Sequence, residues 1–203
     1  MGVFDLKTEF VKYGEYHANK VNVAIHMVFV PTILWTGISM FTHLIPAQLF
    51  TYPAPLAALL SWIPGPAPLE NFATLVMLGY TIFYLILDQV AGLLIVPVMY
   101  TFVVTAEQYA ISSPSAFSVS LGVFIFSWIV QFIGHGVFEK RAPALLDNLL
   151  QAIVMAPFFV FLEALFALGY RPDLHRSFRN EIGTRILAFR RASKYGATAS
   201  TTQ

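Results

Sequence analysis

Residues 21–45 read VNVAIHMVFVPTILWTGISMFTHLI and carry no formally charged side chain. About 20 predominantly apolar residues are enough for a helix to cross a hydrocarbon core of about 30 Å. Pro31 in the interior is tolerated as a kink in such a helix. The stretch therefore predicts a membrane-spanning helix that ends near Pro46.

The composition of the whole chain agrees with a membrane protein. Of its 203 residues, 57% are hydrophobic and 11% are charged, whereas charged residues make up about a quarter of a soluble domain. A formal net charge of +1 gives no overall attraction to nucleic acid. The absence of cysteine excludes disulfides, thiolate metal ligands and a cysteine nucleophile. We expect an integral membrane protein with membrane lipid, and no nucleic acid, among its partners.

Other apolar stretches predict an all-α, polytopic transmembrane bundle with about four to six membrane segments. Residues 72–102 are too long for one span, because thirty-one residues at about 1.5 Å each give roughly 46 Å. Asp88 and Gln89 near the middle indicate a turn between two shorter spans. Residues 115–133 form another span. Residues 49–68 contain five prolines and suit an interfacial or re-entrant connection, so they are not counted as a crossing.

The two ends of the chain are more polar. Residues 4–17 predict an amphipathic helix whose apolar stripe ends at His17. The last apolar stretch, residues 144–168, is followed by a basic segment typical of the cytosolic side. A re-entrant hairpin at Pro157 would place both ends of the chain on that side. We expect one integral-membrane domain over residues 1–190 and a disordered tail over residues 191–203.

Three histidines beside apolar stretches are candidate metal ligands. His17 and His26 would point to opposite sides of one continuous helix, because nine residues rotate by about 900°. Asn19 and Asn22 offer a break, since asparagine is a favoured residue at the start of a helix. Across such a corner His17 can face His26, and His135 can join them if an even number of spans lies between the two segments.

Glu139 follows His135 by four residues, so an α-helix would place the two on one face. Glu139 is therefore a fourth ligand or a residue that holds a ligand in place, and both roles stay open. A site of three imidazoles and a carboxylate suits a mononuclear iron oxygenase, although such ligands also bind zinc. His43 and His175 have no partner at ligand spacing and are left out.

Charged residues near this site have two interpretations each. Lys140 and Arg141 could hold a substrate carboxylate, or they could be the positive residues that ordinarily flank a span. Glu163 lies among phenylalanines and is costly to expose to lipid, so it is expected to face the protein interior.

The chain resembles the small membrane 2-hydroxy fatty acid dioxygenases of fungi, which have bacterial and plant relatives. The resemblance covers most of the chain apart from residues 46–115. It rests on residues 16–19 (YHAN), 23–26 (VAIH), 29–34 (FVPTIL), 131–145 (QFIGHGVFEKRAPAL), 147–148 (DN) and 163–169.

The resemblance implies an iron(II)-dependent dioxygenase of the endoplasmic reticulum membrane. Such an enzyme would use O2 to remove the carboxyl carbon of a 2-hydroxy long-chain fatty acid during phytosphingosine breakdown. His17, His26 and His135 would then bind Fe(2+), with Glu139 as a further candidate, and Lys140 or Arg141 would offset the substrate carboxylate. The alternatives are a zinc-dependent membrane hydrolase and a non-enzymatic lipid-binding protein. Five histidines are too few for a two-iron hydroxylase or desaturase.

Overall fold

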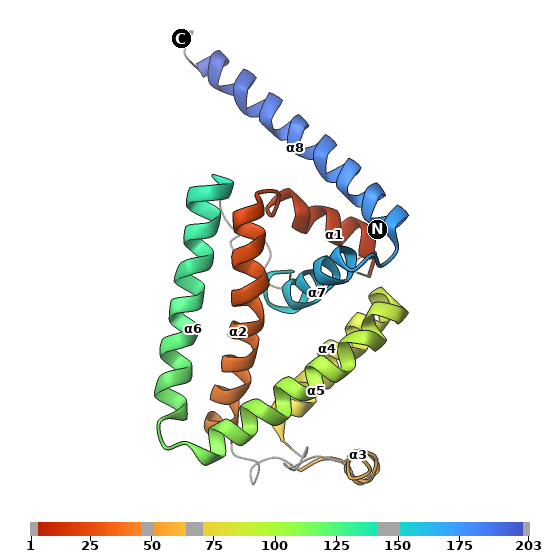
Figure 1. Cartoon of the computed structure of the whole chain (residues 1–203), viewed down its shortest axis with the longest axis vertical. Coiled ribbons are helices and arrows are strands. Elements are labelled where there is room, and N and C mark those ends of the chain that lie inside the picture. Colours follow the sequence, from red (N-terminus) through yellow and green to blue (C-terminus); the bar gives the residue numbers. More distant parts are fainter. Residues whose placement is uncertain (1–3, 46–50, 64–70, 142–150, 201–203) are drawn as a thin grey trace. The chain divides into compact units, whose positions relative to one another are not determined.

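The computed structural model describes residues 4–45, 51–63, 71–141 and 151–200. Every element in these ranges is helical, which confirms the all-α prediction (Figure 1). The α-helices are α1 (Leu6–Glu15), α2 (Lys20–Leu44), α3 (Ala54–Leu60), α4 (Phe72–Leu87), α5 (Gln89–Ser112), α6 (Ala116–Ile133), α7 (Ala156–Ala167) and α8 (Pro172–Ser200). Two π-helical segments are η2 (Gly134–Glu139) and η4 (Gln151–Met155).

Three helices in the described ranges are long and apolar enough to cross a membrane: α2, α5, and α6 continued by η2. α7 and α8 together would make a fourth span, although they are bent by 120°. α4 is apolar but shorter, with 16 residues. The membrane prediction is confirmed, and the described residues contain three candidate spans, or four if α7 and α8 count as one, against the predicted four to six.

The helices pack into two units, residues 24–134 and residues 1–23 with 135–203. In the first unit, α4 and α5 lie side by side (Figure 1). They are separated only by Asp88, whose extended backbone ends α4 and whose side chain accepts hydrogen bonds from the amides of Val90 and Ala91. A side chain at Gly92 would come within 2.7 Å of the Leu85 backbone, so glycine permits this close approach. The predicted break is confirmed.

In the same unit, α2 packs along α6 through small polar and aromatic side chains. Ser120 donates a hydrogen bond of 3.0 Å to Ser39, and the rings of Phe29 and Phe126 meet at 5.9 Å. Pro31 lies inside α2, as predicted. Within residues 49–68, the short helix α3 is far below the length of a span, and residues 46–50 and 64–70 lie outside the described residues.

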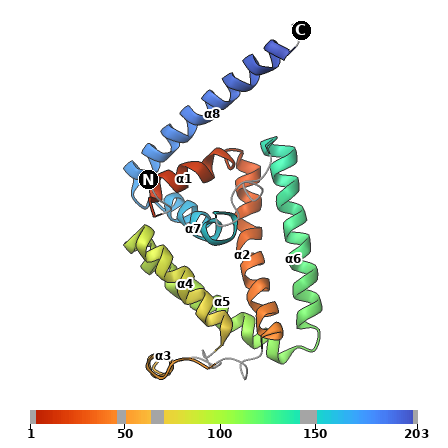
Figure 2. The same cartoon turned by 180° about the vertical axis from the view of Figure 1, so that it is seen from behind.

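The second unit has an aromatic core built around α1. The Phe10 ring is stacked on Phe178 of α8 at 4.9 Å and meets Phe159 and Phe166 of α7 edge-on at 5.4 and 5.5 Å. Figure 2 shows α1 beside α7, with α8 leaving the unit as a long helix. The amphipathic helix predicted over residues 4–17 thus buries its apolar stripe in protein.

The bend in the C-terminal part lies between α7 and α8. Gly169 adopts a left-handed φ of 92°, and the amides of Gly169 and Tyr170 donate to carbonyls of the last turn of α7, which ends that helix. The predicted hairpin at Pro157 is wrong, because Pro157 occupies the first turn of α7, where its missing amide is harmless. α8 runs through residue 190 as one helix to Ser200, so the proposed division into a domain of residues 1–190 and a tail of 191–203 stays a prediction.

Candidate metal centre

His17 lies just after α1 and is held by the helix that precedes it. Its ring is stacked on Tyr13, with 3.9 Å between centroids and 15° between planes. Its Nδ1 atom lies 2.8 Å from the Tyr13 carbonyl oxygen. A carbonyl only accepts hydrogen bonds, so Nδ1 carries the proton and the lone pair lies on Nε2. Burial, with the nearby charge of Glu163, raises the pKa of Tyr13, so its phenol stays neutral.

The chain turns between α1 and α2 at a corner that the sequence predicts. The Asn19 side chain accepts from the amide of Val21, which is the expected cap at the start of α2. The fully buried Asn22 donates through Nδ2 to the Tyr16 carbonyl at 3.1 Å. The backbone before the helix is therefore folded against the first turn of the helix.

Glu139 fastens this corner from a distant part of the chain. Its Oε1 accepts from the amide of Ala18 at 3.2 Å, and its Oε2 accepts from the amide of Asn19 at 3.0 Å and from Asn22 Nδ2 at 3.3 Å. Both carboxylate oxygens are thus used to hold the start of α2. The sequence left open whether Glu139 is a fourth ligand or a supporting residue, and these contacts favour the supporting role.

His135 is positioned by the π-helical segment η2. It is buried, and its ring meets the ring of His17 at 4.9 Å with 75° between planes. The predicted α-helical spacing of His135 and Glu139 is wrong in detail, because residues 134–139 are π-helical. π-helical turns are often found at functional sites. Here the segment combines a histidine at the ring cluster with a carboxylate at the corner.

His26 completes a group of three imidazoles. It lies one turn after Asn22 on the continuous helix α2 and is 3% exposed. One nitrogen from each of His17, His26 and His135 lies within 4.8 Å of the other two, and no other such group of three occurs among the described residues. Two nitrogens bound to one ion at about 2.1 Å are at most about 4.2 Å apart. Three nitrogens on one ion are closer still, at most about 3.6 Å apart, so the side chains would have to approach one another by up to about 1 Å to share one metal ion.

Arg141 and Lys140 occupy different surroundings. The Arg141 guanidinium lies over the Tyr16 ring at 3.7 Å and donates to the Glu15 carbonyl at 3.0 Å. The Glu15 carboxylate lies 3.7 Å from Arg141 and 3.1 Å from Arg185 of α8. Lys140 is exposed and has a left-handed φ of 55°. Arg141 thus joins the corner to α8, whereas Lys140 stays accessible.

The other predicted polar residues lie elsewhere. His43 is on the last turn of α2, with Nδ1 3.2 Å from the Ser39 carbonyl of the same helix. His175 is stacked on Phe166 at 4.6 Å. Neither belongs to the group of three histidines, as predicted. Glu163 of α7 is half-buried, in agreement with the expected inward position.

Sequence reasoning missed Asn22 as a site residue. It was considered only as a helix start, although a fully buried asparagine inside an apolar helix requires hydrogen-bond partners. The signal in the sequence was the presence of an asparagine within an otherwise apolar stretch. The partners themselves, Tyr16 and Glu139, are seen only in the fold.

The fold and the histidine group define a polytopic helical membrane protein with a candidate three-imidazole metal site. Residues 3–168 match the family described as 2-hydroxy-palmitic acid dioxygenase Mpo1-like, and the chain belongs to this family. It is 36% identical over 181 residues to the 2-hydroxy-palmitic acid dioxygenase MPO1 of Saccharomyces cerevisiae, covering 89% of this chain and 91% of that protein. No solved structure matches the chain.

Proposed function

We propose that this protein is an iron(II)-dependent dioxygenase that removes the carboxyl carbon of 2-hydroxy fatty acids. The observation that carries the proposal is the convergence of His17, His26 and His135 in a member of a dioxygenase family. The yeast relative is named for activity on 2-hydroxy-palmitic acid, which suggests the substrate class. The overall change balances with one O2: the hydroxy acid gives the acid one carbon shorter, carbon dioxide and water.

The donor set is compatible with iron. Imidazole binds iron, zinc and copper, and the chain has no thiolate that would favour a closed structural zinc site. Three protein ligands leave positions open for O2 and for the carboxylate and hydroxyl oxygens of a 2-hydroxy acid. When bound, Fe(2+) would activate these reactants beside the carbon–carbon bond that breaks. Reaction with O2 favours iron over zinc, because zinc has no redox chemistry.

The residues around the histidines would keep the ligands in position. The Tyr13 carbonyl fixes the His17 tautomer with its Nε2 lone pair available, which is the usual role of a hydrogen bond to a metal-bound histidine. Glu139 and Asn22 hold the corner from which His17 and His26 extend. These residues need no part in proton transfer. Their role is to prevent the two histidines from separating.

The substrate would combine a polar head and a long alkyl chain. The apolar helices provide surroundings that suit the alkyl chain. Of the two cations first considered for the carboxylate, Lys140 is the better candidate, because Arg141 already contacts Glu15 and Tyr16. We assign the carboxylate role to Lys140 and a structural role to Arg141.

The cellular setting follows from the same resemblance. We place the protein in the endoplasmic reticulum membrane, acting on 2-hydroxy acids released by phytosphingosine breakdown. The support is the set of candidate spans together with the family membership.

The test is mass spectrometry of the products formed from 2-hydroxypalmitate under labelled oxygen, with and without an iron chelator. We expect pentadecanoate carrying labelled oxygen, and none after chelation. The control is His43→Ala, which removes a histidine outside the group. Zinc in the protein with no oxygen uptake would contradict the proposal in favour of a hydrolase. Normal turnover in His135→Ala would contradict the role of the histidine group, and no product from the wild-type chain in the presence of iron and O2 would favour a lipid-binding protein without metal chemistry.

A further inference from the structure

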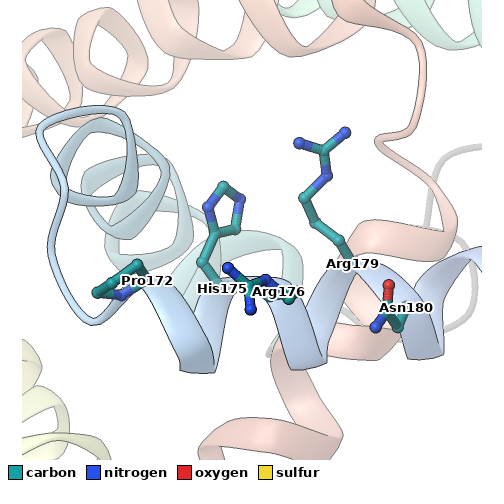
Figure 3. Close-up of a pocket in the computed structure, with 5 residues that line it drawn as sticks. All are labelled: Pro172, His175, Arg176, Arg179 and Asn180. Carbon is teal, nitrogen blue, oxygen red and sulfur yellow. The ribbon is translucent and has the colours of Figure 1, made fainter.

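The first turns of α8 form a polar hollow of about 460 Å³, outside the residues that match the dioxygenase family. Figure 3 shows the His175 and Arg179 side chains rising from the same side of the helix. The volume lies within the range of about 300–1,000 Å³ that is usual for small-molecule sites. The hollow is lined by Pro172, His175, Arg176, Arg179 and Asn180.

One wall of the hollow is rigid. The His175 ring lies flat on Phe166, with 4.6 Å between centroids and 5° between planes. Phe166 is itself buried against Phe10 and Phe178. The imidazole therefore keeps its place when a ligand arrives, which reduces the ordering that binding requires.

The charge in the hollow is positive. Arg176 pairs with Asp173 at 3.8 Å, but both side chains are exposed, so this pair is weak and water can replace it. The Arg179 side chain is exposed, and its charge acts on the half-buried Glu163. The His175 ring lines the same hollow and adds a hydrogen-bonding group beside the two guanidinium groups.

The surface around the hollow suits the boundary of a membrane. Leu168 before the bend is 84% exposed, and Leu187 and Phe189 further along α8 are 55% and 52% exposed. Leu187 and Phe189 share the exposed surface of α8 with arginines. A helix that presents large apolar residues together with cations is typical of the lipid headgroup region.

We propose that this hollow binds the phosphate headgroup of an anionic glycerophospholipid. Arg176 and Arg179 provide two planar groups of donors that suit phosphate oxygens, and Asn180 adds an amide. The lining offers no large apolar side chain, so the hollow does not suit the alkyl chain of a fatty acid. The exposed Leu168 and Leu187 would instead lie against the acyl chains of the same lipid layer.

The experiment is native mass spectrometry of the full chain in detergent, titrated with dioctanoyl phosphatidylglycerol or dioctanoyl phosphatidylcholine. Arg176→Gln with Arg179→Gln removes both guanidinium groups from the hollow. Arg190→Gln with Arg191→Gln is the matched control, since it removes the same charge from the same helix outside the hollow. Circular dichroism and turnover of 2-hydroxypalmitate are measured on each variant, and both are expected to be unchanged.

We expect the wild-type chain to prefer phosphatidylglycerol. The first double variant should bind it at least about tenfold more weakly, because two charge-assisted contacts are lost, and the control less than about twofold more weakly. Equal weakening in both double variants would overturn the proposal, since binding would then follow the overall charge of α8. Displacement of the lipid from the wild-type chain by an equal concentration of inorganic phosphate would also overturn it. That competition needs no variant, so the proposal can fail even if the double variant does not fold.

Discussion

Asp88 and Glu139 are two carboxylates that hold the start of a helix, and they do so from different distances. Asp88 precedes α5 and accepts through Oδ1 from two amides of the first turn. Glu139 accepts from amides at the start of α2 that lie 120 and 121 residues earlier in the chain. It uses both of its oxygens, and Asn22 adds a third bond.

The comparison distinguishes a contact that forms the start of a helix from a contact that forms the metal site. The local bonds of Asp88 allow the chain to break between α4 and α5, and they concern only neighbouring residues. The bonds of Glu139 join the segment that carries His135 to the corner between His17 and the start of α2. We infer that losing the first contact affects the stability of a helix start, whereas losing the second affects the metal site.

The largest effect is expected from the histidines themselves. His26→Ala and His135→Ala should each reduce turnover of 2-hydroxypalmitate at least about 100-fold, because each removes one of three ligands. His43→Ala should retain wild-type turnover, since its ring nitrogen faces its own helix. Turnover is measured by product mass spectrometry on protein of equal helical content. Loss of activity in His43→Ala would show that the assay reports folding and not ligation.

The carboxylates provide the next contrast. Glu139→Gln should weaken metal binding about 10- to 100-fold, because an amide has one acceptor where two oxygens are used. Asp88→Asn should leave metal binding unchanged and stability nearly so, since one oxygen accepts both bonds and asparagine starts helices as well as aspartate does. Anaerobic iron titration and thermal unfolding in detergent measure the two effects. Equal metal affinity in both variants would contradict the distinction.

Gly92→Ala tests the contact between α4 and α5 without changing the residues around the histidines. An added Cβ would lie 2.7 Å from the Leu85 backbone, so α4 and α5 would have to move apart. We expect a destabilisation of about 1–3 kcal/mol, as for other overpacked cores. The iron affinity of the folded protein should stay within about twofold of wild type. Such a change in binding free energy is smaller than RT, which is about 0.59 kcal/mol. Gly79→Ala, which meets no neighbouring atom, is the control for unfolding temperature. A large loss of iron affinity in Gly92→Ala would link the two regions more closely than we infer.

The smallest effects concern Lys140 and Arg141. Lys140→Ala should raise the Michaelis constant for 2-hydroxypalmitate several-fold while leaving thermal unfolding close to wild type. Arg141→Ala should lower stability by about 2 kcal/mol, because it removes a charge-assisted hydrogen bond and a contact with the Tyr16 ring. Steady-state kinetics and thermal unfolding separate the two outcomes. An unchanged Michaelis constant in Lys140→Ala would end the proposed carboxylate role.

Local chemistry explains which parts of the structure could be predicted. The break at Asp88 followed from the length of an apolar stretch, and the start of α2 followed from the preference of asparagine for that position. The approach of His17 to His26 followed from the corner that this start creates, whereas the approach of His135 required an even number of spans between the two segments. The break, the helix start and the corner depend on residues close together in sequence or on a simple length limit.

The remaining features depend on distant contacts. Glu139 could not be assigned one role, because its partners lie 117 to 121 residues away. The π-helical form of residues 134–139 has no sequence signature, and an α-helical spacing was assumed in its place. The bend after α7 was placed at Pro157, whereas proline fits a first helical turn and Gly169 adopts the left-handed backbone that ends the helix.

The central claim is that His17, His26 and His135 together hold one iron ion. The most direct measurement is the iron content of anaerobically purified protein, compared between the wild-type chain, His135→Ala and His43→Ala. We predict about one iron per chain in the wild type and in His43→Ala, and almost none in His135→Ala. Equal iron content in all three proteins, or no iron in the wild type after anaerobic reconstitution, would contradict the claim.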